Sequence, residues 1–489
     1  MFLGSPGSRK KRVGIKSIPL ATLPPGQTRR EEMEDVTSLV DKIQINEQNG
    51  RGHTEGELTP GDAIQNRFFS YLDPNESSKS NATLCGKQKI MSSPNFDHGL
   101  LGMTPDSAPI FLNTSVPFTA IAVGVQGSGK SHSLSVIMES CLINYPPVIR
   151  AHKPCAALVF HYDTDQANYC EVAFLTFRSK MMPDLPVVKE LVILVSPAFF
   201  TQRSKFYRDW PNCTVRPLLF RWRDLTAGIL LALMQVDMDK SPPLYLGALL
   251  DLLRKLQKKN EYPTFQSFKN QLSSLEFTPA QLAPLTLRLQ LIESLLSEST
   301  ENVDLYKSVD LEHIIKSGTV VICDMTDPMM TAGEARGIFE VVLEKFRTLP
   351  TTCGKLAVFD EAHKYMKSEG NDRLSETIIE LSRQMRHHGM RIVVSSQSPA
   401  TIPAELIELS SICIVHKFFS RDWFNKLQAK MPLTAQTYEQ IVQLDTGHAI
   451  VFSGSRSYID SEPDCGQGCN HVMIRNRLTA DGGTSKVST

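Results

Sequence analysis

Short apolar segments recur along the chain, and stretches with helical spacing separate most of them. They span residues 119–125, 156–161, 191–195, 319–324, 356–360, 391–396, 411–416 and 449–453. Most of these segments are rich in β-branched residues and continuously apolar rather than alternating, which is typical of strands buried on both faces of a parallel sheet. Strands that alternate with helices predict an α/β fold with a mostly parallel sheet.

Three other regions differ from this alternation. Residues 1–95 are rich in Gly, Pro, Ser, Asn, Gln and charge, so we expect a disordered polar tail. Residues from about 225 to 299 carry leucines at helical spacing interrupted by prolines, which predicts a helical insertion. The predicted core therefore spans residues 96–480 and contains this insertion, and residues 481–489 are expected to form a flexible end.

The composition is that of a soluble globular protein. The 489 residues include 52 Lys and Arg against 52 Asp and Glu, and 41% are hydrophobic. A zero net charge argues against a protein that coats nucleic acid through bulk charge. No apolar run approaches the ~20 residues that cross a bilayer, and the N-terminus lacks the apolar region of a secretory signal. We therefore expect an intracellular protein of the nucleus or cytoplasm, without membrane insertion.

The cysteines do not predict a disulfide framework, because all 10 are scattered without regular spacing. Cys465 and Cys469, with His471 close by, could form half of a zinc site. A structural zinc site needs a second pair of ligands at similar spacing, and none accompanies these residues. A loop with two free thiols is the simpler interpretation.

The strongest motif follows the first predicted strand and fits the pattern G-x-x-x-x-G-K-[ST]. Its residues are Gly124, Val125, Gln126, Gly127, Ser128, Gly129, Lys130 and Ser131. The glycines allow successive backbone N–H groups to point at phosphate oxygens, and the predicted helix adds a positive N-terminus. Lys130 can reach the β- and γ-phosphates, while the Ser131 hydroxyl can bind Mg²⁺. A glycine-rich turn can precede a helix by chance, but this strand and helix context favours nucleotide binding.

A second motif has two acids at the end of an apolar strand, within residues 355–363. Asp360 can bind the hydration shell of Mg²⁺ there, and Glu361 can polarise the water that attacks the γ-phosphate. An Asp-Glu pair alone is more often a solvated helix start, but the upstream phosphate loop favours the functional interpretation. The sequence lacks the [NT]-K-x-D motif that reads guanine, and the second acid argues against a small-molecule kinase. ATP hydrolysis is therefore the expected reaction.

Polar residues around the next strand complete the predicted site. Gln397 follows that strand, where it can sense the γ-phosphate and orient the attacking water. Just upstream, Arg386 can project into the nucleotide of a neighbouring subunit as an arginine finger. A solvated cation at a helix C-terminus is the alternative, and Arg383 and Arg391 are the next candidates for the finger.

Together these motifs resemble the HerA/FtsK superfamily of ring-forming, DNA-pumping ATPases, and the HerA branch most closely. The resemblance rests on the phosphate loop, on residues 358–363, and on the order from Arg386 through Gly389 to Gln397. It covers roughly residues 96–480. It implies a RecA-like P-loop core of the additional-strand catalytic-glutamate class, with ATP and Mg²⁺ as cofactors. It also implies a homo-oligomeric ring, a hexamer, with DNA as the translocated substrate and a nuclease as a further partner.

The chain departs from that family at two points. A polar tail replaces the small N-terminal barrel of archaeal HerA, and His161-Tyr162-Asp163 stands where relatives often carry an acidic-histidine turn. Two alternatives stay open: a protein-transport ATPase of the same superfamily, and a nucleotide-gated scaffold without turnover. A two-domain helicase of the DEAH type does not fit, because too few residues follow His363 for a second motor domain.

Overall fold

The computed structural model describes most of the chain from residue 82 onward. The described ranges are 82–91, 96–180, 182–234, 244–259, 263–275, 277–297, 311–368, 372–457, 459 and 467–482. The chain divides into two units, Met1–Thr59 and Pro60–Thr489, and the described residues all belong to the second. The predicted tail up to residue 81 and the C-terminal end from residue 483 lie outside the described residues.

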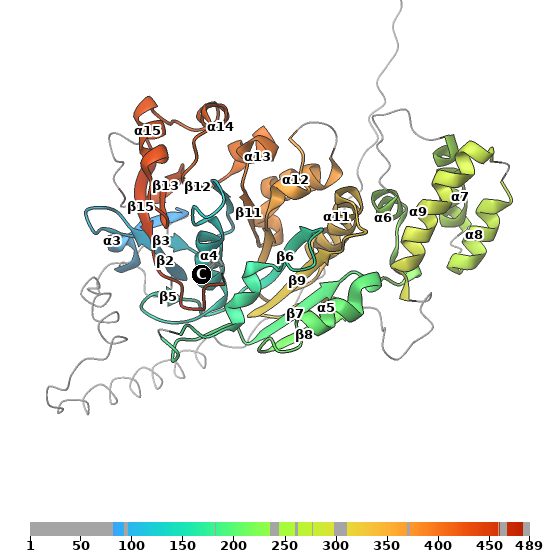
Figure 1. The fold of residues 1–489 in the computed structure, drawn as a ribbon, viewed down its shortest axis with the longest axis horizontal. Coiled ribbons are helices and arrows are strands. Elements are labelled where there is room, and N and C mark those ends of the chain that lie inside the picture. The colour runs from blue at the N-terminus through green and yellow to red at the C-terminus, as the bar shows by residue number, and fades with distance from the viewer. Residues whose placement is uncertain are drawn as a thin grey trace, which may run out of the picture. The chain divides into compact units, whose positions relative to one another are not determined.

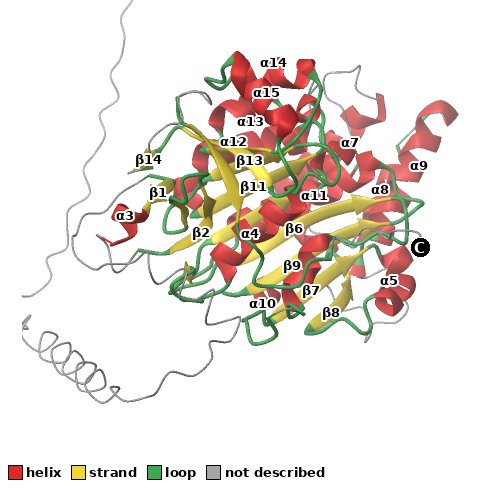
Figure 2. Cartoon of the chain, turned by 60° about the vertical axis from the view of Figure 1, so that its left-hand side comes forward, coloured by secondary structure: helices red, strands yellow, loops and turns green. Residues whose placement is uncertain are grey.

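Parallel strands form the centre of one sheet (Figures 1 and 2). They are β4 (Thr119–Val123), β6 (Ala156–Asp163), β7 (Glu190–Val195), β8 (Cys213–Pro217), β9 (Thr319–Thr326), β10 (Lys355–Phe359), β11 (Met390–Ser396) and β12 (Ile412–Val415). Their order is β12-β4-β11-β10-β6-β9-β7-β8, and each neighbouring pair is parallel. This confirms the predicted α/β fold, and β11 lies between the phosphate-loop strand β4 and the acidic strand β10.

The sheet continues beyond β12 with mostly antiparallel strands, and of these the sequence predicted only β13. They are β13 (His448–Ser453), β15 (Cys469–Ile474), β2 (His98–Met103), β3 (Pro109–Asn113) and β1 (Leu84–Gly86), with β5 (Ile149–Arg150) and β14 (Arg456–Ser457) at the margins. Leu84 and Cys85 of β1 are buried, although they fall in the predicted tail. The predicted tail therefore extends too far toward the core. Pairing with β3 buries these apolar residues, but they are too few to form a pattern that the sequence shows.

Helices cover both faces of the sheet, as continuously apolar strands require. Outside the insertion, they are α3 (Lys87–Met91), α4 (Lys130–Leu142), α5 (Phe200–Phe206), α10 (Leu311–Ile314), α11 (Ala332–Thr348), α12 (Arg373–His388), α13 (Ala404–Leu409), α14 (Arg421–Gln428) and α15 (Ala435–Gln443). Ile121 of β4 packs in a core with α11 and α12, whereas the next residue, Ala122, packs in a second core with α4. No helix in the described ranges is long and apolar enough to cross a membrane.

Helices also occupy the stretch predicted as an insertion, between β8 and β9. They are α6 (Ala227–Leu233), α7 (Leu244–Lys259), α8 (Phe265–Ser273) and α9 (Pro279–Ser294). α6 contacts α11 of the core, and α9 contacts α6 and α7. The contact between α6 and α11 is close, because a Cβ on Gly337 would lie only 2.5 Å from the Ala232 carbonyl oxygen. The insertion is therefore attached to the core through α6.

Candidate functional site

The phosphate-loop motif connects β4 to α4 at the carboxyl edge of the parallel strands. Gly127 and Gly129 have φ angles of 75° and 108°, in the left-handed region that favours glycine. Helix α4 begins directly after Gly129. Lys130 Nζ and Ser128 Oγ donate hydrogen bonds to the Val125 carbonyl oxygen, at 3.0 and 2.7 Å. The lysine side chain therefore folds back over the loop that the motif predicted.

A buried histidine supports this loop, and the sequence analysis did not identify it. His416 follows β12, and its ring nitrogens contact the Ser133 hydroxyl at 2.9 Å and the His448 carbonyl oxygen at 3.0 Å. Burial lowers the pKa of His416 to about 3, so the ring is neutral near pH 7. A Cβ on Gly124 would lie 2.7 Å from the His416 Cβ. The histidine and this glycine together fix the position of the loop.

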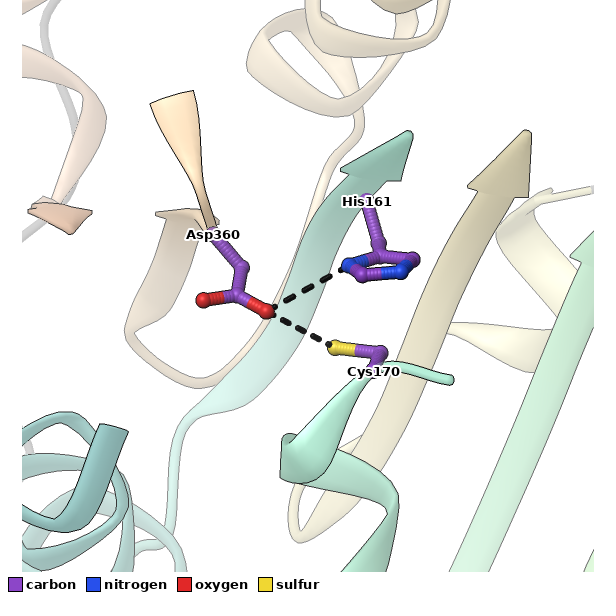
Figure 3. Close-up of side chains that lie close together, drawn as sticks. All are labelled: His161, Cys170 and Asp360. Atoms are coloured by element: carbon purple, nitrogen blue, oxygen red, sulfur yellow. Dashed lines mark hydrogen bonds and ion pairs between the residues drawn. The ribbon is translucent and has the colours of Figure 1, made fainter. Parts of the chain in front are cut away.

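The Asp360 carboxylate follows β10 and contacts side chains on the β6 side (Figure 3). Its Oδ2 lies 3.4 Å from His161 Nδ1 and accepts a 3.6 Å hydrogen bond from the Cys170 thiol. Its buried Oδ1 has no hydrogen-bond partner among the described residues. Burial opposes ionisation, but the neighbouring His161 outweighs it and holds the pKa of Asp360 below its ordinary value. Asp360 is therefore an anion with one oxygen available to a cation.

The next residue, Glu361, faces a different set of groups. Its φ of 49° is left-handed, a strain that persists where the surrounding structure imposes it. Its Oε2 accepts a 2.7 Å hydrogen bond from Gln397 Nε2 and lies 3.4 Å from His363 Nδ1. Burial raises the pKa of Glu361 and the charge of Asp360 raises it further, while Lys130 opposes both. A carboxylate of raised pKa held by a hydrogen bond suits a general base.

The two motifs meet at Lys130. Burial lowers the pKa of the Lys130 ammonium group, and the charges of Glu361 and Asp360 oppose that shift. Each acid is thus near enough to affect the lysine. The fold therefore joins the phosphate loop, the acidic pair and, through its hydrogen bond to Glu361, the Gln397 amide.

A third carboxylate near the loop was missed. Glu171 begins the short 3₁₀ helix η1 (Glu171–Thr176), and its charge also acts on Lys130. Burial raises the pKa of Glu171, Asp360 adds to this, and the Ser131 hydroxyl lowers it. Its sequence signal was an acidic residue after the second predicted strand, and our prediction there named only residues 161–163.

A cavity of about 740 Å³ opens beside the phosphate loop, within the usual size range of ligand sites. Its lining includes Gly129, Lys130, Ser131, Glu171, Gly447 and Arg477. The cavity thus joins the phosphate loop, the start of η1 and the segment after β15. Asp360, Glu361 and Gln397 are not part of its lining.

The three candidate arginine fingers have different environments. Arg391 is buried and donates a 2.6 Å hydrogen bond to the Thr114 carbonyl oxygen, so its role is structural. Arg383 pairs with Glu405. Arg386 is exposed near the C-terminus of α12. Because α12 leads into the start of β11, Arg386 lies toward the amino edge of the sheet, and the phosphate loop lies at the carboxyl edge.

The described residues of the cysteine motif near the C-terminus, Cys469 and His471, do not form a metal site. Cys465 lies outside the described residues, and Cys469 is a buried free thiol in β15. His471 shares a 3.0 Å hydrogen bond with His448. Where the structure describes the chain, the group of side chains that could hold a metal ion is instead His161, Cys170 and Asp360.

Comparisons with protein-family models and with curated proteins gave no match. Among solved structures, VirB4 of Thermoanaerobacter pseudethanolicus is 12% identical with a TM-score of 0.47, covering 77% of this chain and 96% of that one. The bacterial conjugative coupling protein TrwBdeltaN70 is 12% identical with a TM-score of 0.42, covering 74% and 87%. The genome packaging NTPase B204 from Sulfolobus turreted icosahedral virus 2, in complex with ATP-gammaS, is 8% identical with a TM-score of 0.29, covering 70% and 93%.

The resemblance to the HerA/FtsK superfamily rests on the motifs of this chain, from the phosphate loop to Gln397. The assignment of the fold rests on the chain itself. The order β12-β4-β11-β10-β6 has an additional strand between the phosphate-loop strand and the acidic strand. That order is the RecA-like arrangement which the resemblance implied.

Proposed function

We propose that this chain binds MgATP at the carboxyl edge of its parallel strands and hydrolyses it. The observation that carries the proposal is the 2.7 Å hydrogen bond from Gln397 Nε2 to Glu361 Oε2 beside the phosphate loop. This contact holds a carboxylate of raised pKa within electrostatic reach of Lys130. A carboxylate in that environment is suited to accept a proton from an attacking water.

The reaction would use residues that are already close together. Backbone N–H groups of the loop would bind phosphate oxygens, and Lys130 would exchange the Val125 carbonyl for the β- and γ-phosphates. The water oxygen would form a bond to the γ-phosphorus while Glu361 accepts its proton. The bond from the γ-phosphorus to the bridging oxygen would break, leaving ADP and phosphate. Gln397 would hold Glu361 before the reaction and orient the water during it.

Ser131 and Asp360 are the residues that would hold Mg²⁺. Both offer oxygen donors, which Mg²⁺ prefers, and the buried Asp360 Oδ1 lacks a hydrogen-bond partner in the described chain. Bound Mg²⁺ would neutralise charge on the β- and γ-phosphates. The residues present therefore fit this cofactor.

The position of Arg386 favours a ring in which one subunit completes the site of the next. Arg386 lies toward the amino edge of the sheet, so it would have to reach the nucleotide of a neighbouring subunit. We propose a homo-oligomeric ring, hexameric as in the family that the motifs resemble, and DNA as the translocated substrate. The choice of DNA follows from that resemblance.

The rate of ATP hydrolysis with and without nucleic acid tests this function. We expect MgATP turnover by the purified chain and stimulation by double-stranded DNA above that by single-stranded DNA or RNA. Lys130→Ala is the control for contaminating ATPases and should reduce the rate to background. Turnover that none of the nucleic acids stimulates would contradict the DNA motor and favour protein transport. ATP binding without any turnover would favour a scaffold.

A mixing experiment tests the ring. Arg386→Ala should retain ATP binding and lose most turnover, because the γ-phosphate charge would lack its counter-charge. Lys130→Ala subunits have a defective loop but an intact Arg386. Mixed oligomers of the two variants should therefore recover part of the turnover. Absence of recovery in oligomers shown to contain both variants would contradict a finger that acts between subunits.

A further inference from the structure

Three potential metal ligands from separate segments lie close together between the end of β10 and strand β6. His161 is on β6, Cys170 directly precedes η1, and Asp360 follows β10 (Figure 3). Their exposed fractions are 3%, 0% and 3%. They lie far apart in the sequence, so only the parallel order of β10 and β6 and the return of the chain into η1 bring them together.

The distances from Asp360 Oδ2 to the other two ligand atoms fit a small tetrahedral ion. Asp360 Oδ2 is 3.4 Å from His161 Nδ1 and 3.6 Å from Cys170 Sγ, and all three ligand atoms lie within 4.8 Å of one another. Zinc with bond lengths of about 2.0–2.3 Å requires ligand atoms about 3.3–3.6 Å apart in tetrahedral geometry. The two distances from Asp360 Oδ2 therefore fit such an ion, and the His161 and Cys170 ligand atoms lie no more than 4.8 Å apart.

A second observation also indicates a ligand. Both ring nitrogens of His161 and the Asp360 Oδ1 are buried without a hydrogen-bond partner in the described ranges. Buried polar atoms are normally satisfied, so each such atom requires an explanation. An ion bound to His161 Nδ1 and to Asp360 Oδ2 would satisfy one of these atoms, His161 Nδ1.

We propose that His161 Nδ1, Cys170 Sγ and an Asp360 oxygen form a binding site for Zn²⁺. A thiolate and an imidazole select zinc over Mg²⁺, which prefers oxygen donors alone. Three protein ligands leave the fourth tetrahedral position for a water molecule. Because burial raises the pKa of the Cys170 thiol, binding displaces its proton to the solvent as the Sγ–Zn bond forms.

Asp360 belongs to this site and to the proposed MgATP site. A zinc ion held by His161 and Cys170 would keep the carboxylate on the β6 side and weaken its contribution to Mg²⁺ binding. Zinc would thus inhibit ATP hydrolysis. The binding site stands on geometry alone, whereas this inhibitory effect rests on the proposed function.

The alternative is a direct pair between His161 and Asp360 that excludes metal. Burial opposes protonation of His161, but Asp360 and Asp324 raise its pKa above the ordinary value. An imidazolium would then neutralise Asp360 without an ion. The two interpretations differ in metal content, which can be measured.

The test is zinc binding by the full chain, measured by competition with a chromophoric chelator. We expect one site per chain in the wild type and a loss of affinity of more than about 100-fold in Cys170→Ser and His161→Gln, since even outer-shell changes cost 10–100-fold. Cys353→Ser, a half-buried cysteine elsewhere, is the matched control and should bind as the wild type does. Unchanged affinity in Cys170→Ser, or no binding at micromolar zinc in the wild type, would overturn the site.

Cobalt binding to the wild type gives an answer that does not depend on the folding of a variant. Co²⁺ at this site should produce a thiolate-to-cobalt absorption band and tetrahedral visible bands, and an octahedral spectrum without thiolate would overturn the proposal. Zinc should also lower ATP turnover, with the half-inhibiting concentration raised at least about 10-fold in Cys170→Ser. A chain that binds zinc but never hydrolyses ATP would refute the proposed function and leave the zinc site intact. Turnover without zinc binding would refute only the zinc site.

Discussion

Asp360 and Glu361 are consecutive residues, yet their side chains have different neighbours. Asp360 contacts His161 and Cys170 on the β6 side, and its pKa is lowered. Glu361 accepts a hydrogen bond from Gln397, and its pKa is raised by burial. One acid is thus held as an anion, and the other is suited to take up a proton. The neighbouring strands, rather than the residue types alone, therefore divide the two roles.

The strand order and one unusual backbone conformation produce this difference. β10 pairs with β6 on one side and with β11 on the other. At Glu361 the backbone enters the left-handed region, with φ of 49° and ψ of 42°. This turn separates the direction of the second side chain from that of the first. A strained backbone at this residue is therefore part of the proposed site.

The largest expected effect follows from removing the proton-accepting group. Glu361→Gln retains the size of the side chain but cannot take up a proton near pH 7. We expect ATP turnover to fall by about 10²–10⁴-fold, while ATP affinity changes little. Steady-state phosphate release and titration with a fluorescent ATP analogue measure the two quantities.

Glu376→Gln is the matched control, because Glu376 is an exposed glutamate on α12. It should leave turnover unchanged. Turnover that persists in Glu361→Gln would show that the two acids do not divide the roles as described, and another group would have to activate the water.

A smaller effect is expected from Gln397→Ala. The hydrogen bond from Gln397 lowers the pKa of Glu361, so its loss should raise that pKa further. A general base must be ionised, and the acidic limb of the pH–rate profile should therefore move to higher pH. Turnover near pH 7 should fall by about 10- to 100-fold, as for loss of a hydrogen bond to a charged group. An unmoved acidic limb would mean that Gln397 does not act through Glu361.

The smallest effect concerns His416, the titratable group behind the phosphate loop. Its pKa is about 3 in the folded chain against an ordinary 6.5. Between these values the unfolded chain binds more protons, so stability falls as the pH drops from about 6.5 toward 3. In His416→Gln the free energy of unfolding should depend less steeply on pH. The loss of one titrating proton reduces the slope by up to about 1.4 kcal/mol per pH unit. Denaturant unfolding at several pH values measures the slope, and an unchanged slope would refute the neutral assignment.

The sequence predicted the parallel half of the sheet better than the antiparallel half, for a physical reason. β4, β10 and β11 are buried on both faces, so each has a continuous apolar pattern that is visible locally. β1 and β14 are very short and pair across a long sequence separation, with Leu84 opposite Arg456. Their burial depends on partners that no local pattern identifies.

The candidate site divides in the same way. Lys130, Asp360 and Glu361 belong to local motifs whose spacing is set by one loop or one strand end, and the sequence identified them. Cys170 and His416 reach the site only through the packing of distant segments. A single chain therefore predicts the motif residues, while the groups that tune and support them require the fold.

The most direct test of the division between the two acids is the Mg²⁺ dependence of ATP affinity in Asp360→Asn and Glu361→Gln, measured beside the wild type. Mg²⁺ should strengthen ATP binding by Glu361→Gln as it does in the wild type. In Asp360→Asn the factor by which Mg²⁺ strengthens ATP binding should fall by at least about 10-fold, because a metal-binding carboxylate is lost. An equal response to Mg²⁺ in the two variants would show that Asp360 is not the acid that binds Mg²⁺.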